Sequence, residues 1–112
     1  MYSRELLKGI LKPIILKLLS DNSRMYGYEI VQKVKELSNH KILIKEGSLY
    51  PALHSLTKEG YLQTESVMIG NRTRKYYKLS SSGKGQVSPA LDELLDFAQT
   101  LKTLFEPKPT IA

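Results

Sequence analysis

The stretch EGSLYPALHSLTKEGYL, residues 46–62, decides the fold, because both ends of a helix can be read from it. Ser48 is the expected N-cap, since its side-chain oxygen can accept a hydrogen bond from a backbone amide of the first turn. Pro51 then occupies the third helical position, where a missing amide costs no intrahelical hydrogen bond. Gly60 can adopt the left-handed conformation that commonly ends a helix. The sequence therefore predicts a helix that starts directly after Ser48 and stops before Gly60.

This helix has two faces of different chemistry. The inward face is apolar and consists of Leu49, Ala52, Leu53 and Leu56. The outward face is aromatic, polar and cationic and consists of Tyr50, His54, Thr57 and Lys58. Such a face can donate and accept hydrogen bonds, although packing against a neighbouring element explains Tyr50 or His54 equally well.

Two extended runs follow the helix and predict a β-hairpin. They cover Tyr61–Ile69 and Arg74–Leu79, and Gly70–Thr73 joins them as a turn. Positive charge gathers in this region, because residues 66–85 contain no acidic side chain and five basic ones, namely Arg72, Arg74, Lys75, Lys78 and Lys84. Tyr76 and Tyr77 are expected to pack within the protein.

Two helices are expected before residue 46. Apolar side chains recur every three or four residues between Leu6 and Leu19, which predicts the first helix. Pro13 lies either in its first turn, with a start near Lys12, or at a kink. After a turn at 21–23, a second helix begins around Tyr26 and turns four apolar side chains inward: Ile30, Val31, Val34 and Leu37.

A long helix is expected near the C-terminus. After the turn-like segment Ser80–Gly85, it runs from Gln86 to about Phe105. Its apolar residues follow a spacing of 4, 3, 4, 3, 4, which is typical of a coiled-coil seam: Val87, Leu91, Leu94, Ala98, Leu101 and Phe105. A second apolar row, which contains Phe97, widens the face. A second copy of the same helix is expected to cover this face; the alternative is packing within one subunit.

Composition limits the class of protein. The 112 residues suit one domain, and 41% hydrophobic and 25% charged residues are typical of a soluble globular chain. The net charge of +6 favours a polyanionic partner such as nucleic acid over an anionic membrane surface. The absence of cysteine excludes disulfides and cysteine-bound zinc. No apolar stretch approaches the about 20 residues that cross a bilayer, and Met1 leads into mixed-charge sequence, so we expect a cytoplasmic protein.

The order helix, helix, helix, hairpin, long helix predicts a winged helix-turn-helix, a mainly α fold with a two-stranded β-wing, plus a long C-terminal dimerisation helix. In this fold the third helix enters the DNA major groove, and the wing reaches phosphates or the minor groove. The expected DNA-binding residues are Lys45, Ser48, Tyr50, Pro51, His54, Thr57, Lys58, Arg72, Arg74 and Lys75. We expect a DNA-binding region at 1–85, the dimerisation helix at 86–106 and a flexible tail at 107–112.

Four segments resemble the PadR family of bacterial transcriptional regulators: LKGILKPIILKLL (7–19), YGYEI (26–30), the stretch at 46–62, and RKYYKLSSSG (74–83). The resemblance covers about residues 6–85. It implies a homodimeric repressor that binds a partly palindromic operator in double-stranded DNA and releases it on a chemical signal. The short C-terminal helix is similar to that of the smaller subfamily, which dimerises through it.

The resemblance also bears on a ligand. Some small members related to multidrug response stack flat drugs on a tryptophan of the C-terminal helix, and this chain has no tryptophan. Phe97 is the nearest aromatic candidate for a pocket that takes a small hydrophobic or aromatic effector, although helical spacing alone favours a core role for it.

Two other classes of function compete with a sequence-specific regulator. An enzyme would need catalytic groups. The two histidines, His40 and His54, have no partners at the spacing of metal ligands, and the sequence contains no Gly-rich phosphate loop. We therefore expect no enzyme activity, cofactor or metal. The stronger rival is a winged-helix module for nonspecific DNA or protein interaction, because a domain of charge +6 binds phosphates in any case. The outward face of the third helix separates these two hypotheses.

Overall fold

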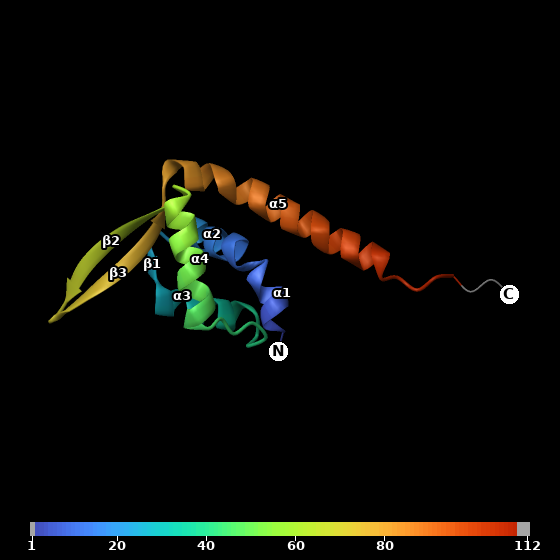
Figure 1. The fold of residues 1–112 in the computed structure, drawn as a ribbon, viewed down its shortest axis with the longest axis horizontal. Coiled ribbons are helices and arrows are strands. Elements are labelled where there is room, and N and C mark those ends of the chain that lie inside the picture. Colours follow the sequence, from blue (N-terminus) through green and yellow to red (C-terminus); the bar gives the residue numbers. More distant parts are fainter. Residues whose placement is uncertain (1, 110–112) are drawn as a thin grey trace.

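The computed structural model describes residues 2–109 and is mainly helical with one small sheet (Figure 1). In chain order the elements are α1 Arg4–Lys8, α2 Leu11–Asp21, β1 Met25–Tyr26, α3 Gly27–Leu37, α4 Glu46–Lys58, β2 Leu62–Ile69, β3 Arg72–Leu79 and α5 Ser81–Leu104. This is the predicted winged helix-turn-helix with a long C-terminal helix. Residues 107–109 of the expected tail form neither helix nor strand, and residues 110–112 lie outside the described residues.

The expected first helix is divided into α1 and α2. α1 ends at Gly9, and α2 begins at Leu11, so Pro13 falls in the first turn of α2, where its missing amide has no intrahelical acceptor. Of the two alternatives for Pro13, the position in a first turn is therefore confirmed.

The core gathers around α2, which packs against α3, α4, α5 and β3. Its buried apolar side chains come from every helix except α1 and α5 and from all three strands: Leu11, Ile15, Leu16, Leu18, Leu19, Met25, Ile30, Val34, Ile44, Leu49, Leu53, Leu56, Leu62, Tyr77 and Leu79, with Ile44 from the loop before α4. Burial raises the pKa of the Tyr77 phenol. The inward face predicted for α4 is confirmed, but Leu37, predicted to point inward from α3, is the last residue of that helix and is 70% exposed.

The sheet has three strands in the order β1-β3-β2, all antiparallel, so β2 and β3 form the predicted two-stranded wing and the short strand β1 is added beside β3. β1 has two residues, which is too short to show the alternation that identifies a strand. The turn between β2 and β3 is also shorter than expected, because Ile69 pairs with Arg72. Only Gly70 and Asn71 form it, and the φ of +61° at Gly70 suits the first position of a type II′ turn.

The C-terminal end of α4 agrees with the prediction. Gly60 has a φ of +87°, and its amide donates to the Thr57 carbonyl. The Tyr61 amide donates to the Leu56 carbonyl, and each of these two bonds spans 3.0 Å. This pair of bonds is the Schellman motif that glycine favours.

α5 begins at Ser81, five residues before the expected start, so the segment 81–85 is helical and not a turn. Its Ser and Gly residues suggested a turn, but the Ser80 hydroxyl accepts a hydrogen bond from the Gly83 amide and caps a helix instead. α5 packs along α2 and then runs past the rest of the protein (Figure 1).

Candidate nucleic-acid interface

The start of α4 lies earlier than the sequence indicated. The N-cap is Lys45, with extended backbone, and the amides of Ser48 and Leu49 both donate to the Lys45 carbonyl at 3.0 Å. Glu46 occupies the first turn, where a negative charge is favourable. Ser48 is therefore inside the helix and is not its N-cap. Pro51 falls in the second turn, so it does remove the hydrogen bond to the carbonyl of exposed Gly47, contrary to the expectation.

The outward face of α4 carries the predicted side chains. Tyr50, Pro51, His54 and Lys58 are exposed, as is Lys45 just before the helix, whereas Ser48 and Thr57 are half-buried. The Thr57 hydroxyl donates to the Leu53 carbonyl at 2.8 Å, so this hydroxyl already has a hydrogen-bond acceptor within its own helix. Four of the predicted residues thus share an open helical surface.

Tyr50 is both exposed and packed. Its side chain is 45% exposed, and its hydroxyl lies 2.5 Å from the point where a Cβ on Gly27 would stand. The ring therefore fills the space that the missing side chain of Gly27 leaves at the start of α3. This contact orients Tyr50 and leaves His54 one turn away in the open.

The wing carries its basic residues in two different environments. Arg72 and Lys75 are exposed. Arg74 is half-buried, with its guanidinium 4.1 Å from the ring centroid of Tyr26. Arg74, two residues after the start of β3, therefore holds the wing against the start of α3, a cation–π contact that the sequence did not reveal.

A second cation–π pair continues this cluster. The Arg24 guanidinium lies 4.2 Å from the ring centroid of Tyr76 and also pairs with Glu65 of β2 at 3.1 Å. Tyr76 and Tyr26 meet edge to face with centroids 5.6 Å apart. Tyr76 thus packs within the wing, as expected, and the cluster connects β1, β2 and β3.

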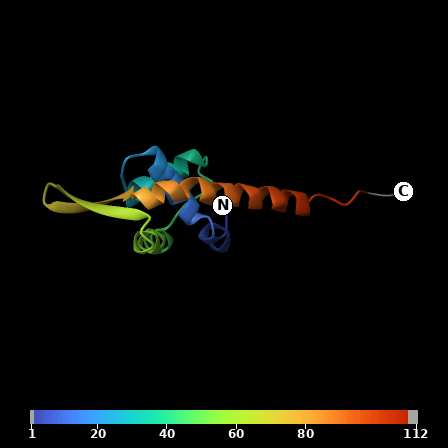
Figure 2. The same cartoon turned by 90° about the horizontal axis from the view of Figure 1, so that it is seen from above.

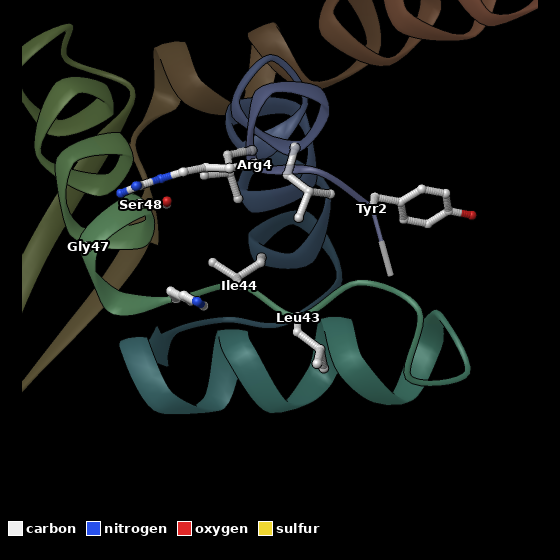
Figure 3. A pocket seen from close by; sticks show the side chains of 9 residues that line it. Tyr2, Arg4, Leu43, Ile44, Gly47 and Ser48 are labelled. Atoms are coloured by element: carbon white, nitrogen blue, oxygen red, sulfur yellow. The ribbon is translucent and has the colours of Figure 1, made fainter.

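α1 and α4 project on the same side of the protein (Figure 2). Residues of both helices line a common groove. Arg4 of α1 extends toward Ser48 of α4 beside the pocket that Leu43 and Ile44 line (Figure 3). Farther along the groove, Lys12 pairs with Glu59, which also accepts a hydrogen bond from the Ser55 hydroxyl. The Lys12 and Ser55 bonds lower the pKa of Glu59. Arg4 is not among the residues predicted to bind DNA, because only the fold brings α1 next to α4.

The seam of α5 is covered near its start and open toward its end. Val87 packs against the core, and Leu91, Leu94 and Leu101 are half-buried. Ala98 is exposed, and Phe105, just after the helix, is 74% exposed. The neighbouring side chains Leu95, Phe97 and Leu104 are exposed as well. The second half of α5 thus presents an apolar surface that its own subunit leaves uncovered.

Phe97 borders a groove of about 340 Å³ between α1 and α5. Its other lining residues include Leu6 and Pro13 on one side and Leu94 on the other, with Glu5 and Glu93 as the acidic members. Phe97 itself is 56% exposed, so it is not a core residue of this subunit.

Among residues 2–109, no cluster of three His, Cys, Asp or Glu side chains is arranged to hold a metal ion. In the same part of the chain, no helix is both long and apolar enough to span a membrane.

Comparison with known proteins places this fold among transcriptional regulators. The model of the PadR-like transcriptional regulator family matches residues 15–89. The transcriptional regulator Rv3488 of Mycobacterium tuberculosis is 32% identical over 94 residues, which cover 81% of this chain and 84% of that protein. A transcriptional regulator from Clostridium thermocellum has a similar structure, with a TM-score of 0.83 and 25% identity over 95% of this chain and all of that one.

The structure of a longer relative contains bound DNA. The negative transcriptional regulator PadR of Bacillus subtilis is 31% identical over 97 residues, which cover 86% of this chain and 53% of that protein. Its structure in complex with operator DNA matches with a TM-score of 0.64 over 91% of this chain and 50% of that one. This chain thus corresponds to about half of the longer relative.

Proposed function

This chain belongs to the PadR-like family of transcriptional regulators, and on that basis we propose that it is a homodimer that binds a partly palindromic operator. α4 enters the major groove, and the wing contacts the adjacent phosphates or the minor groove. One observation carries this proposal: Tyr50 of α4 packs on Gly27, and Arg74 of the wing stacks on Tyr26, the preceding residue. Both the open face of α4 and strand β3 of the wing are thereby attached to the start of α3.

We assign separate roles to the residues of this surface. Tyr50 and His54 are the candidates for base contacts, because both are exposed on α4 and both can donate or accept hydrogen bonds. Arg72, Lys75 and Lys45 are exposed cations suited to phosphates. Arg74 contacts DNA only with the part of its guanidinium that Tyr26 leaves open. Ser48, Pro51, Thr57 and Lys58 complete the proposed interface.

Equilibrium binding tests the proposal, with the DNA upstream of the gene compared with a scrambled duplex of equal length at several salt concentrations. We expect a preference of about 10³ or more for the upstream DNA, the lower range for specific regulators. Equal affinity for both duplexes, lost steeply with salt, would instead support the rival hypothesis of a module for nonspecific DNA or protein interaction.

Substitutions on α4 and on the wing should act differently. Tyr50→Phe keeps the ring over Gly27 and removes the hydroxyl, and His54→Ala removes the imidazole. Each is expected to reduce the preference for the operator about tenfold, because a lost base contact costs about 1–3 kcal/mol. Arg72→Ala and Lys75→Ala should weaken binding to both duplexes and lower the salt slope by about 0.9 each. The same loss for all four variants on both duplexes would contradict readout by α4.

We further propose repression released by a small hydrophobic or aromatic effector in the groove beside Phe97, with the protein acting in the cytoplasm, where the operator lies. The name of the Bacillus subtilis relative supports a negative role. The groove supports the effector, because the exposed aromatic side chain of Phe97 lines it together with the apolar residues Leu6, Pro13 and Leu94.

Planar aromatic compounds test the effector site. They should release the operator complex of the unmodified protein and should fail to release that of Phe97→Ala. Tyr28→Ala is the matched control, because Tyr28 is an exposed aromatic residue of α3 outside this groove. Equal release from all three proteins would place the effector elsewhere.

A further inference from the structure

α1 contributes little to the core of its own subunit. It has five residues, and none of them is buried. Gly9 and Ile10 separate α1 from α2, and the two helices run in different directions (Figure 1). The helix is nevertheless capped at its start, where the Ser3 hydroxyl accepts a hydrogen bond from the Leu6 amide. A short ordered helix without a fully buried side chain calls for a role at the surface.

The position of α1 suggests what this role is. α1 lies beside α4 on the side of the protein from which both helices project (Figure 2). A trough of about 700 Å³ separates them, and we call it the α1–α4 trough. One wall carries Arg4, Lys8 and Lys12, and the other wall is formed by the part of α4 between Gly47 and Ser55. The pocket of Figure 3 adjoins the trough, because the two share Arg4, Leu11, Gly47 and Ser48.

Positive charge is available at only one end of this trough. At the far end, Glu59 neutralises Lys12. At the near end, no ion pair of the described residues involves Arg4, Lys8 or Lys45. Glu5 is the one acidic residue that lines the trough.

Arg4 and Lys8 are matched to an extended anion. They stand four residues apart, so their side chains leave α1 on the same face, one turn from each other. Arg4 reaches toward Ser48 and the first turn of α4 (Figure 3). Guanidinium and ammonium groups spaced along a trough suit successive phosphates better than one compact anion.

We propose that α1 is a second DNA-contacting element, in which Arg4 and Lys8 bind phosphates of the strand that borders the major groove on the side of α4 away from the wing. The proposal rests on α4 lying in that groove. A helix in the major groove has a sugar–phosphate backbone on each side of it. The wing then holds one backbone, and α1 holds the other.

The test replaces both residues by uncharged side chains of similar length, in the variant Arg4→Gln/Lys8→Gln. Binding is measured against the upstream and the scrambled duplex over a range of salt concentrations. We expect the salt slope to fall by about 1.8 per half-site on both duplexes, because each phosphate contact contributes about 0.9. Affinity at 0.1 M salt should fall about tenfold or more, with the preference between the duplexes unchanged.

Two controls isolate the position of the charges from their number. Lys102→Gln/Lys108→Gln removes the same net charge at the far end of the chain, and it should leave the slope within a few tenths of that of the unmodified protein. Arg4→Lys/Lys8→Arg keeps both charges and should restore the slope. Since α1 buries no side chain, all variants should show unchanged circular dichroism and thermal unfolding.

The outcomes separate this inference from the proposed function. If Arg4→Gln/Lys8→Gln and the Lys102/Lys108 control have equal slopes, α1 does not contact phosphates and the inference is wrong. If the unmodified protein does not distinguish the two duplexes, operator recognition fails instead. A slope difference between the variants would in that case still place α1 on the DNA.

Discussion

Glutamate at both Leu94 and Leu101 is expected to convert the protein into a monomer that has lost most of its operator affinity. Both residues lie on the apolar seam of α5, and the second half of this helix runs beyond the rest of its own subunit (Figure 1). Two buried carboxylates in a helix–helix interface would have no partners, so association becomes strongly unfavourable. Light scattering measures the mass, and titration with operator DNA measures the affinity.

The size of this loss follows from geometry. Two half-sites of a palindromic operator lie about 34 Å apart, so they need two linked recognition helices. Linking two binding modules raises the overall affinity by about 10²–10⁴ over that of one module. The monomer should therefore bind a full operator about 10²-fold or more weakly, while its affinity for a single half-site changes little.

The control adds the same charges on the other face of α5. Gln99→Glu/Thr103→Glu changes two exposed residues and should remain dimeric. Leu94 also borders grooves of its own subunit, so Leu101→Glu/Phe105→Glu repeats the experiment with side chains at the end of α5. A Leu94→Glu/Leu101→Glu variant that keeps the mass of a dimer would move the interface elsewhere, for example to α1 and α2.

The helix faces could be predicted from the sequence because burial follows a simple period. Leu49, Leu53 and Leu56 recur at helical spacing and are all almost fully buried. The ends of elements follow weaker signals. Ser48 has the side chain of an N-cap, but Lys45 begins α4, because a helix can start at any residue whose backbone is extended and whose carbonyl accepts the first bond.

The candidate site was predictable only in part, for a related reason. The open positions of Tyr50 and His54 follow from the same helical period. The environment of Arg74 does not, because it depends on Tyr26 in β1, a strand that forms only when β3 is beside it. The position of Arg4 beside α4 was likewise not predictable, since its neighbour Ser48 is more than forty residues away in the chain. Contacts between segments that are distant in the chain leave no local pattern in the sequence from which they could be predicted.

The second large effect is expected at Gly83, in the first turn of α5. A Cβ at this position would stand 2.0 Å from the carbonyl oxygen of Tyr61, and 3.3 Å from Cδ2 of Leu79. The Tyr61 oxygen cannot move aside easily, because it accepts a hydrogen bond from the Ser80 amide at 3.0 Å. Gly83→Ala must therefore push the start of α5 away from the end of α4, with a loss of about 3 kcal/mol or more in the free energy of unfolding.

Gly85 supplies a matched control two residues later in the same helix. Nothing lies within 4 Å of a Cβ at Gly85, so Gly85→Ala should stabilise the protein by about 0.5–1 kcal/mol through helix propensity. Urea unfolding at one fixed protein concentration compares the two variants, because the stability of a dimer depends on concentration. Equal urea midpoints of unfolding for Gly83→Ala and Gly85→Ala would show that Gly83 does not lie close to the Tyr61 carbonyl in solution.

Gly83→Ala should also change DNA binding, because α5 connects the recognition helix α4 to the proposed dimer interface. The hydroxyls of Ser80 and Ser82 both donate to the Gly60 carbonyl, at 2.6 and 2.9 Å, so the start of α5 is attached directly to the end of α4. If α5 carries the dimer interface, its angle to α4 sets the distance between the two recognition helices. At temperatures where Gly83→Ala remains folded, it should therefore lose affinity for the full operator while binding a single half-site normally. Loss on both duplexes alike would mean instead that the substitution distorts α4 itself.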